Sequence, residues 1–114
     1  MDLKEKIKAA DDIKKKIVKM PEWDNIEIEV RSMSGYHRAM MFDTCINEKG
    51  NFSRAKSHPF FVFACSFDPQ TGTRIFDETD LDWIGEKNAG ALEKIVLPAM
   101  KLSGLAGIEE IEKN

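Results

Sequence analysis

The sequence predicts a single α+β domain that is predominantly helical, with an N-terminal β-hairpin packed on three to four helices. Two short β-prone runs near the N-terminus support the hairpin, and later segments with helical periodicity and capping residues support the helices. The 114 residues fit one domain, and the 42% hydrophobic content is enough for a core. We expect a frayed charged segment at 1–14, the globular domain at 15–105 and a C-terminal tail at 106–114.

The first predicted element of the domain is the hairpin. Residues 17–20 form a short β-prone run, and turn-forming residues at 21–25 interrupt it. Residues 26–31 then alternate strictly between apolar and charged side chains, which is typical of a half-buried strand with its charges facing water. Because an isolated hairpin is marginal in water, we expect its apolar face to rest on helices.

Two helical segments are expected in the middle of the chain. Ser34 is the expected N-cap of a helix over 36–46, which the turn-forming residues 47–51 end. The apolar run at 59–67 is compatible with a buried strand or a buried helix. A helix is favoured, with Pro59 in its first turn, where the missing N–H costs nothing.

The last part of the chain carries the clearest turn and helix signals. Residues 68–72 predict a turn, because proline presets φ and glycine accepts a positive φ. Asp77 is expected to cap a short helix, and Asn88 is expected to cap a long one with apolar residues at helical spacing. Pro98 is expected to kink the long helix, and Gly104 is expected to end it.

Charge and hydropathy argue against several classes of protein. The net charge of −3 opposes nucleic-acid binding, which usually needs a basic surface. No apolar run approaches the ~20 residues that span a bilayer, and the charged N-terminus lacks a signal-peptide core, so we expect no membrane partner and a cytosolic location. Residues 1–20 carry a net +3 and residues 68–114 a net −5. This asymmetry fits solvated faces, or head-to-tail attraction between copies.

The sequence contains no recognisable catalytic or metal-binding motif. Phosphate-binding loops, dinucleotide fingerprints, zinc-protease motifs and nucleophile elbows are all absent. His37 with Cys45, and His58 with Cys65, are zinc-type ligands, but their spacings of eight and seven do not match zinc knuckles. Both cysteines fall on apolar faces, which favours buried, reduced thiols. We expect no enzyme activity, no cofactor and no metal ion.

Motifs in both halves of the chain resemble those of a known protein family. The matching segments, in order, are ADDI at 10–13, PEW at 21–23, IEVRSMSG at 28–35, FDPQTG at 67–72 and LSGL at 102–105. Together they resemble the small tail assembly chaperones of long-tailed bacteriophages and prophages of Gram-positive bacteria. The resemblance covers roughly residues 10–105.

The resemblance implies a non-enzymatic function in virion assembly. Such chaperones bind the long, helical tape measure protein while the tail is built, help to recruit tail tube subunits, and are absent from the mature virion. A location in the host bacterial cytoplasm follows, and in many such phages a ribosomal frameshift yields a longer form. The alternatives are a structural phage protein, such as a tail-completion or head–tail connector subunit, and a small nucleic-acid-binding regulator.

An apolar stripe at the C-terminus is the candidate partner-binding site. Its members recur at a spacing of three and continue past Gly104, where burial in the domain's own core looks hardest: Leu102, Leu105, Ile108 and Ile111. We expect this stripe to contribute to partner binding or to self-association into a homo-oligomer.

Overall fold

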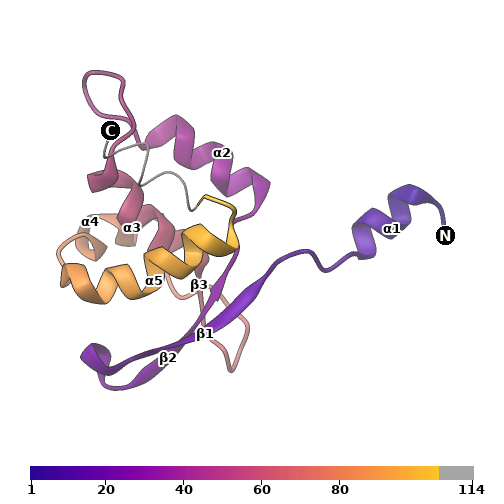
Figure 1. Ribbon diagram of the computed structural model, residues 1–114, viewed down its shortest axis with the longest axis horizontal. Helices are drawn as coiled ribbons and strands as arrows, with labels where there is room; N and C mark the ends of the chain where they lie inside the picture. Colours follow the sequence, from indigo (N-terminus) through magenta and orange to yellow (C-terminus); the bar gives the residue numbers. More distant parts are fainter. Residues whose placement is uncertain (106–114) are drawn as a thin grey trace.

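A computed structural model, which describes residues 1–105, confirms the predicted α+β class (Figure 1). A three-stranded antiparallel sheet, in the order β1-β2-β3, lies against a layer of helices. The elements, in chain order, are α1 (Leu3–Ala9), β1 (Lys15–Met20), η1 (Pro21–Trp23), β2 (Ile26–Arg31), α2 (Gly35–Thr44), α3 (Arg54–Cys65), β3 (Ser66–Phe67), η2 (Glu78–Asp80), α4 (Leu81–Ile84) and α5 (Ala89–Leu102).

The predicted hairpin is formed by β1 and β2. A single 3-10 turn and two residues in the left-handed region, Asp24 (φ 62°) and Asn25 (φ 58°), reverse the chain between the strands. Ile28 and Val30 of β2 are buried, as the alternation predicts. They face α5 and α3, which lie against the same side of the sheet.

Strand β1 forms one outer edge of the sheet, since β2 is the middle strand. Three of its six residues are exposed lysines: Lys15, Lys16 and Lys19. Lysines on an edge strand oppose pairing with the edge of another sheet, so the charges on β1 should disfavour aggregation through this edge.

Helix α3 is the central element of the core. Its buried residues are eight of twelve: Ser57, Pro59, Phe60, Phe61, Val62, Phe63, Ala64 and Cys65. Helices α2, α4 and α5 and the sheet all pack against α3. The helix prediction for 59–67 is therefore confirmed as far as Cys65, and burial on every face explains why periodicity alone could not decide between helix and strand.

Both ends of this helix differ from the prediction. The helix begins at Arg54, because Ser53 caps it by accepting a hydrogen bond from the Lys56 N–H at 3.3 Å. Pro59 therefore lies inside α3 and not in its first turn. At the other end the helix stops at Cys65, and the next two residues form the short strand β3 beside β2.

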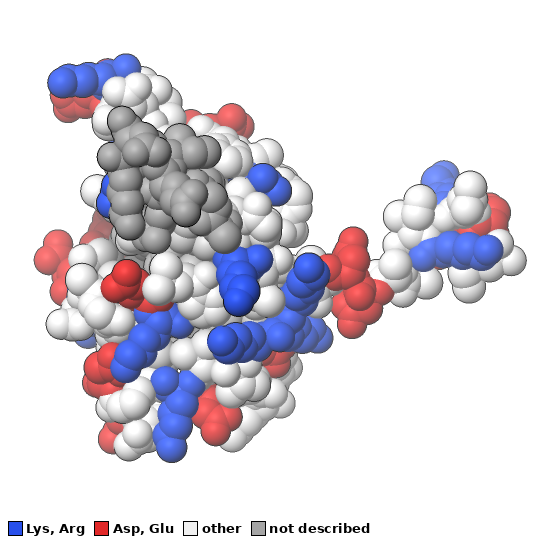
Figure 2. All heavy atoms as spheres, viewed as in Figure 1, with Lys and Arg blue, Asp and Glu red and all other residues white. Residues whose placement is uncertain are grey.

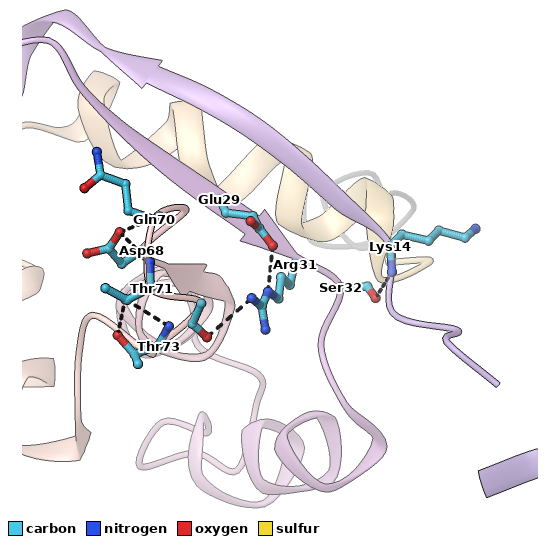
Figure 3. A network of polar contacts seen from close by, with 9 residues as sticks. Lys14, Glu29, Arg31, Ser32, Asp68, Gln70, Thr71 and Thr73 are labelled. Carbon is cyan, nitrogen blue, oxygen red and sulfur yellow. Dashed lines mark hydrogen bonds and ion pairs between the residues drawn. The ribbon is translucent and has the colours of Figure 1, made fainter. Parts of the chain in front are cut away.

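The turn at 68–72 is hydrogen-bonded to a side chain of the middle strand β2 (Figure 3). The carboxylate of Asp68 accepts hydrogen bonds from the backbone N–H groups of the next residues, and Gly72 has φ +74°. Arg31 donates to the Gly72 carbonyl at 3.4 Å and to Glu29 at 2.9 Å, and its guanidinium lies 3.9 Å from the centroid of the Phe67 ring. Glu29 and Arg31 are thus half-buried, which corrects the expectation that they face water.

Helix α2 buries only part of its apolar side chains. Ser34 caps it as expected, and Met41 and Cys45 enter the core. Phe42 and Ile46 are 44% and 40% exposed. The helix ends at Thr44, so Ile46 leaves the helical path and joins a β-bridge across the following turn.

Helix α5 continues through Pro98 and ends at Leu102, and Gly104 closes it as predicted. The N–H of Leu105 donates to the Met100 carbonyl at 2.8 Å, and the N–H of Gly104 donates to the Lys101 carbonyl at 3.2 Å. This pair of bonds is a Schellman motif, with Gly104 left-handed at φ +73°. The hydroxyl of Ser103 accepts from the Met33 N–H at 2.8 Å, which ties the end of α5 to the end of the hairpin.

Replacing Gly104 by alanine should lower the free energy of unfolding by about 1–2 kcal/mol, because an L-residue is strained in the left-handed region. Gly35→Ala is the matched control, since nothing lies within 4 Å of its added Cβ and its φ is not positive. That control should leave stability equal or slightly raised. Urea unfolding followed by circular dichroism measures both, and equal midpoints would contradict the helix-end geometry.

Candidate partner-binding surface

The predicted C-terminal stripe is divided by the structure. Leu105 is only 4% exposed and belongs to the hydrophobic core, so the premise that burial is hardest there is wrong for this residue. The Schellman motif turns the chain back and carries Leu105 inward. Leu102 is half-buried at the rim of the core. Ile108 and Ile111 lie outside the described residues, and the partner-binding role itself stays a prediction.

Leu102 also lines a shallow hollow between the start of β1 and the end of α5. The hollow has a volume of about 320 Å³. Its lining combines two apolar residues with three ammonium groups: Pro98, Leu102, Lys14, Lys16 and Lys101. Figure 2 shows basic side chains gathered near the middle of the face in view, over these two elements. The hollow therefore offers an apolar floor with a basic rim.

Local geometry explains how this surface is built. Leu97 lies one helical turn before Lys101, and Pro98 one turn before Leu102, so all four share the outer side of α5. Leu97 is 44% exposed. The start of β1 is held by the Lys14 N–H, which donates to the Ser32 hydroxyl at 2.9 Å. We call Leu97, Pro98, Lys101 and Leu102, with Lys14 and Lys16, the C-terminal patch.

A second hollow, of about 440 Å³, lies between the end of α2, α3 and α4. We call it the helical groove. Its floor is largely apolar and consists of Cys45, Ala55, Pro59, Phe60, Leu81 and Gly85. Asp82 and Glu86 stand on its α4 side, and Lys56 lies opposite with its ammonium 2.8 Å from the Ile46 carbonyl. At Gly85 α4 lies close to α3, since an added Cβ would be in van der Waals contact with Pro59 Cγ at 3.4 Å.

The residues considered as zinc ligands do not converge on one point. His37 is held on α2, where its Nδ1 lies 3.0 Å from the Ser34 hydroxyl and 3.4 Å from Arg74 Nη2. Burial, and then the charge of Arg74, lower the pKa of His37. Among residues 1–105, no three histidine, cysteine or acidic side chains are grouped to hold a metal ion. None of the helices in this range is long and apolar enough to cross a membrane.

The two thiols are held in unreactive states. Cys45 and Cys65 are free and buried, as predicted. Burial raises the pKa of both, and it raises the pKa of Cys65 to about 12. Because the thiolate is the nucleophile and the metal ligand, a thiol held in this way is poorly suited to either role.

Sequence reasoning missed both the exposed residues of the C-terminal patch and the helical groove. The position of Leu97 could have indicated the C-terminal patch, because this apolar residue lies outside the buried stripe of α5 and one turn from Lys101. The helical groove had a weaker signal in the pair Asp82 and Glu86, which are spaced as helix neighbours. Its floor comes from three separate helices, so no local pattern could have predicted it.

Comparison with solved structures finds a similar fold in the tail assembly chaperone of bacteriophage HK97. The TM-score is 0.64 and the sequences are 14% identical. The match covers 86% of this chain and 90% of that chain. At this identity the likeness shows a shared fold. No family model and no curated protein matches the sequence.

Burial of the Cys65 thiol should make stability depend on pH. The unfolded thiol ionises near its ordinary value of 9.0, whereas the pKa in the folded chain is about 12. The folded state therefore keeps the Cys65 proton to a higher pH than the unfolded state does. Between pH 9.0 and about pH 12 the free energy of unfolding should fall by up to about 1.4 kcal/mol per pH unit. Urea unfolding of wild type and Cys65→Ala at pH 8 and pH 10 measures this, and the advantage of wild type should shrink at pH 10. A constant difference would contradict the raised pKa.

Proposed function

We propose that this chain is a phage tail assembly chaperone that binds the tape measure protein by reversible contact during tail morphogenesis. The observation that carries the proposal is the fold shared with the HK97 tail assembly chaperone over nearly the full length of both chains. The likeness covers most of both chains and is not limited to one common motif.

The family-like segments of the sequence support the proposal, because each has a structural role here. The PEW segment forms the hairpin turn, where Glu22 pairs with Lys94 at 2.7 Å. The FDPQTG segment forms the turn that accepts Arg31, and the LSGL segment forms the end of α5. Segments with such roles are expected to accompany a fold wherever it occurs, so the sequence resemblance and the fold likeness support each other.

A physical account links the C-terminal patch to this function. A tape measure protein exposes apolar helical faces before it is enclosed in the tail tube, and large exposed apolar surfaces aggregate. A patch that combines an apolar floor with flexible lysine stems can cover such faces without a rigid fit. Each contact need not be tight, because many copies along one long chain gain avidity.

The remaining parts of the proposal concern place and partners. The chaperone would act in the host bacterial cytoplasm, would help to bring tail tube subunits to the tape measure protein, and would leave before the virion is complete. A structural tail-completion or connector protein would instead remain in purified virions. Mass spectrometry of purified virions distinguishes these two functions.

Co-expression with the tape measure protein tests the proposed contact. Leu97→Asp combined with Lys101→Glu places two carboxylates on the C-terminal patch and reverses its basic charge. Leu97 is 44% exposed and Lys101 is exposed, so the fold should persist. Co-purification should fall by about tenfold or more. The free energy lost when one apolar side chain is no longer buried at the contact is larger than the free energy that corresponds to a tenfold change in affinity.

Ile75→Asp is the matched control, because Ile75 is 41% exposed and lies away from the C-terminal patch beside β2. It should leave co-purification unchanged. If both variants bind the tape measure protein as wild type does, the C-terminal patch is not the contact. If wild type itself fails to co-purify, the proposed function is wrong.

A further inference from the structure

The C-terminal patch combines exposed apolar surface with positive charge that lacks a nearby counter-charge. Leu97 is 44% exposed, and Pro98 and Leu102 are half-buried beside it. Three lysines line the hollow in this patch: Lys14, Lys16 and Lys101. Within residues 1–105, no acidic side chain lines the hollow, and none of the three ammonium groups is part of an ion pair. The complement of such a surface is a segment that carries both apolar side chains and carboxylates.

The residues that follow Leu105 have this chemistry. The segment 106–114, which we call the tail, lies outside the described residues, and its sequence is AGIEEIEKN. It contains three glutamates and one lysine, and its two large apolar side chains, Ile108 and Ile111, are three residues apart. The tail therefore offers two isoleucines to an apolar floor and a net negative charge to a basic rim.

The tail begins beside the patch. Leu105 follows Leu102 by only three positions, and the Schellman motif fixes where the chain leaves α5. Leu97 precedes Leu102 by about 8 Å along the helix axis. The nine residues 106–114 reach about 30 Å when extended, so the tail can lie along α5 as far as Leu97. Because the tail is tethered, its effective concentration at the patch is in the millimolar range, and a weak contact is enough to hold it.

Two other hollows suit the tail less well. The helical groove carries Asp82 and Glu86, which would repel an acidic segment. A hollow of about 340 Å³ has basic residues in its lining, but it includes Ala89, the first residue of α5. Ala89 lies about 20 Å along the helix axis from Leu102. Of these three, the C-terminal patch is the one that is both basic and next to the tail.

We propose that the tail folds back onto the C-terminal patch of its own chain, with Ile108 and Ile111 against the apolar floor and the glutamates against the lysines. The fold-back covers the surface at which the tape measure protein is proposed to bind, so the free chain shields its own apolar patch. A partner segment must then displace the tail. The fold-back itself does not depend on the proposed function, whereas the competition with the tape measure protein rests on it.

Paramagnetic broadening of amide NMR signals tests the fold-back without any partner. A spin label on Lys113→Cys reports where the tail lies, because the two native thiols are buried and should stay unlabelled. The signals of Leu97 and Lys101 should be broadened, and the signal of Ile75 should not. Raising the salt concentration should weaken the broadening, because exposed charges are screened.

Substitution of the isoleucines tests the apolar part of the contact. Ile108→Asp combined with Ile111→Asp should abolish the broadening at Leu97 and Lys101, because the apolar contact is lost. The matched control is Ile108→Leu combined with Ile111→Leu, which keeps the apolar side chains and should keep the broadening.

A charge exchange tests the polar part of the contact. Three reversals in the tail should remove most of the broadening: Glu109→Lys, Glu110→Lys and Glu112→Lys. Three reversals in the patch should do the same: Lys14→Glu, Lys16→Glu and Lys101→Glu. These lysines are exposed, so the fold should persist. A chain that carries all six substitutions should recover much of the broadening, because the attraction is restored with its signs exchanged.

Three results would overturn the fold-back. The signals of Leu97 and Lys101 could stay sharp, the label could broaden the signal of Ala89 in their place, or the aspartate and leucine variants could behave alike. A mixture of spin-labelled chains with unlabelled, isotope-enriched chains separates the remaining occupant. Broadening that arises only between molecules would assign the tail to a second copy and would also overturn the proposal.

Affinity for the tape measure protein tests the competition. A chain that ends at Gly107 keeps Leu105 in the core and lacks both tail isoleucines. If the tail covers the patch about nine-tenths of the time, this chain should bind about tenfold more tightly than the full chain. Equal affinity with the broadening present would support the fold-back and remove the C-terminal patch from tape measure binding. If neither chain binds while the broadening is present, the fold-back is supported and the proposed function is wrong.

Discussion

Burial of α3 on all sides is the constraint on which the rest of the structure depends. Its second half is a continuous apolar run with no polar face to offer to water, so α2, α4, α5 and the sheet must cover it. The two ends of the helix are closed by specific polar groups. Ser53 caps the beginning, and Arg74 donates to the Ala64 carbonyl at 2.9 Å near the end. The hairpin, α4 and α5 can then be understood as the layers that enclose this helix.

The parts of the fold that could be predicted are those with local causes. The caps at Ser34 and Asn88 and the helix end at Gly104 depend on hydrogen bonds between near neighbours, and the structure contains all three. The start of α3 was not predicted, although Ser53, which caps it, is a local signal that places Pro59 inside the helix. Leu105 was assigned to a binding stripe from its spacing, although the glycine before it was the signal that the chain turns inward.

The segments that resemble the family and the candidate binding surfaces are different parts of the molecule. The segments form a hairpin turn, a locked loop and a helix end, and these roles maintain the backbone path. The C-terminal patch and the helical groove are formed mostly by side chains outside those segments. A fold can therefore be shared at 14% identity while the surfaces that meet other molecules change. For the same reason, sequence motifs in this chain carry more information about architecture than about partners.

The lysine-rich edge of β1 has a consequence for how this domain meets extended polypeptide segments. An unprotected edge strand is a template on which extended segments of another polypeptide can add as new strands and seed fibrils. Positive charge on Lys15, Lys16 and Lys19 opposes such templating. Chemical acetylation of these amines would remove the charge and leave Ile17, 49% exposed, in a neutral strand. The domain would then present a neutral six-residue edge, on which extended segments of another polypeptide could add more readily.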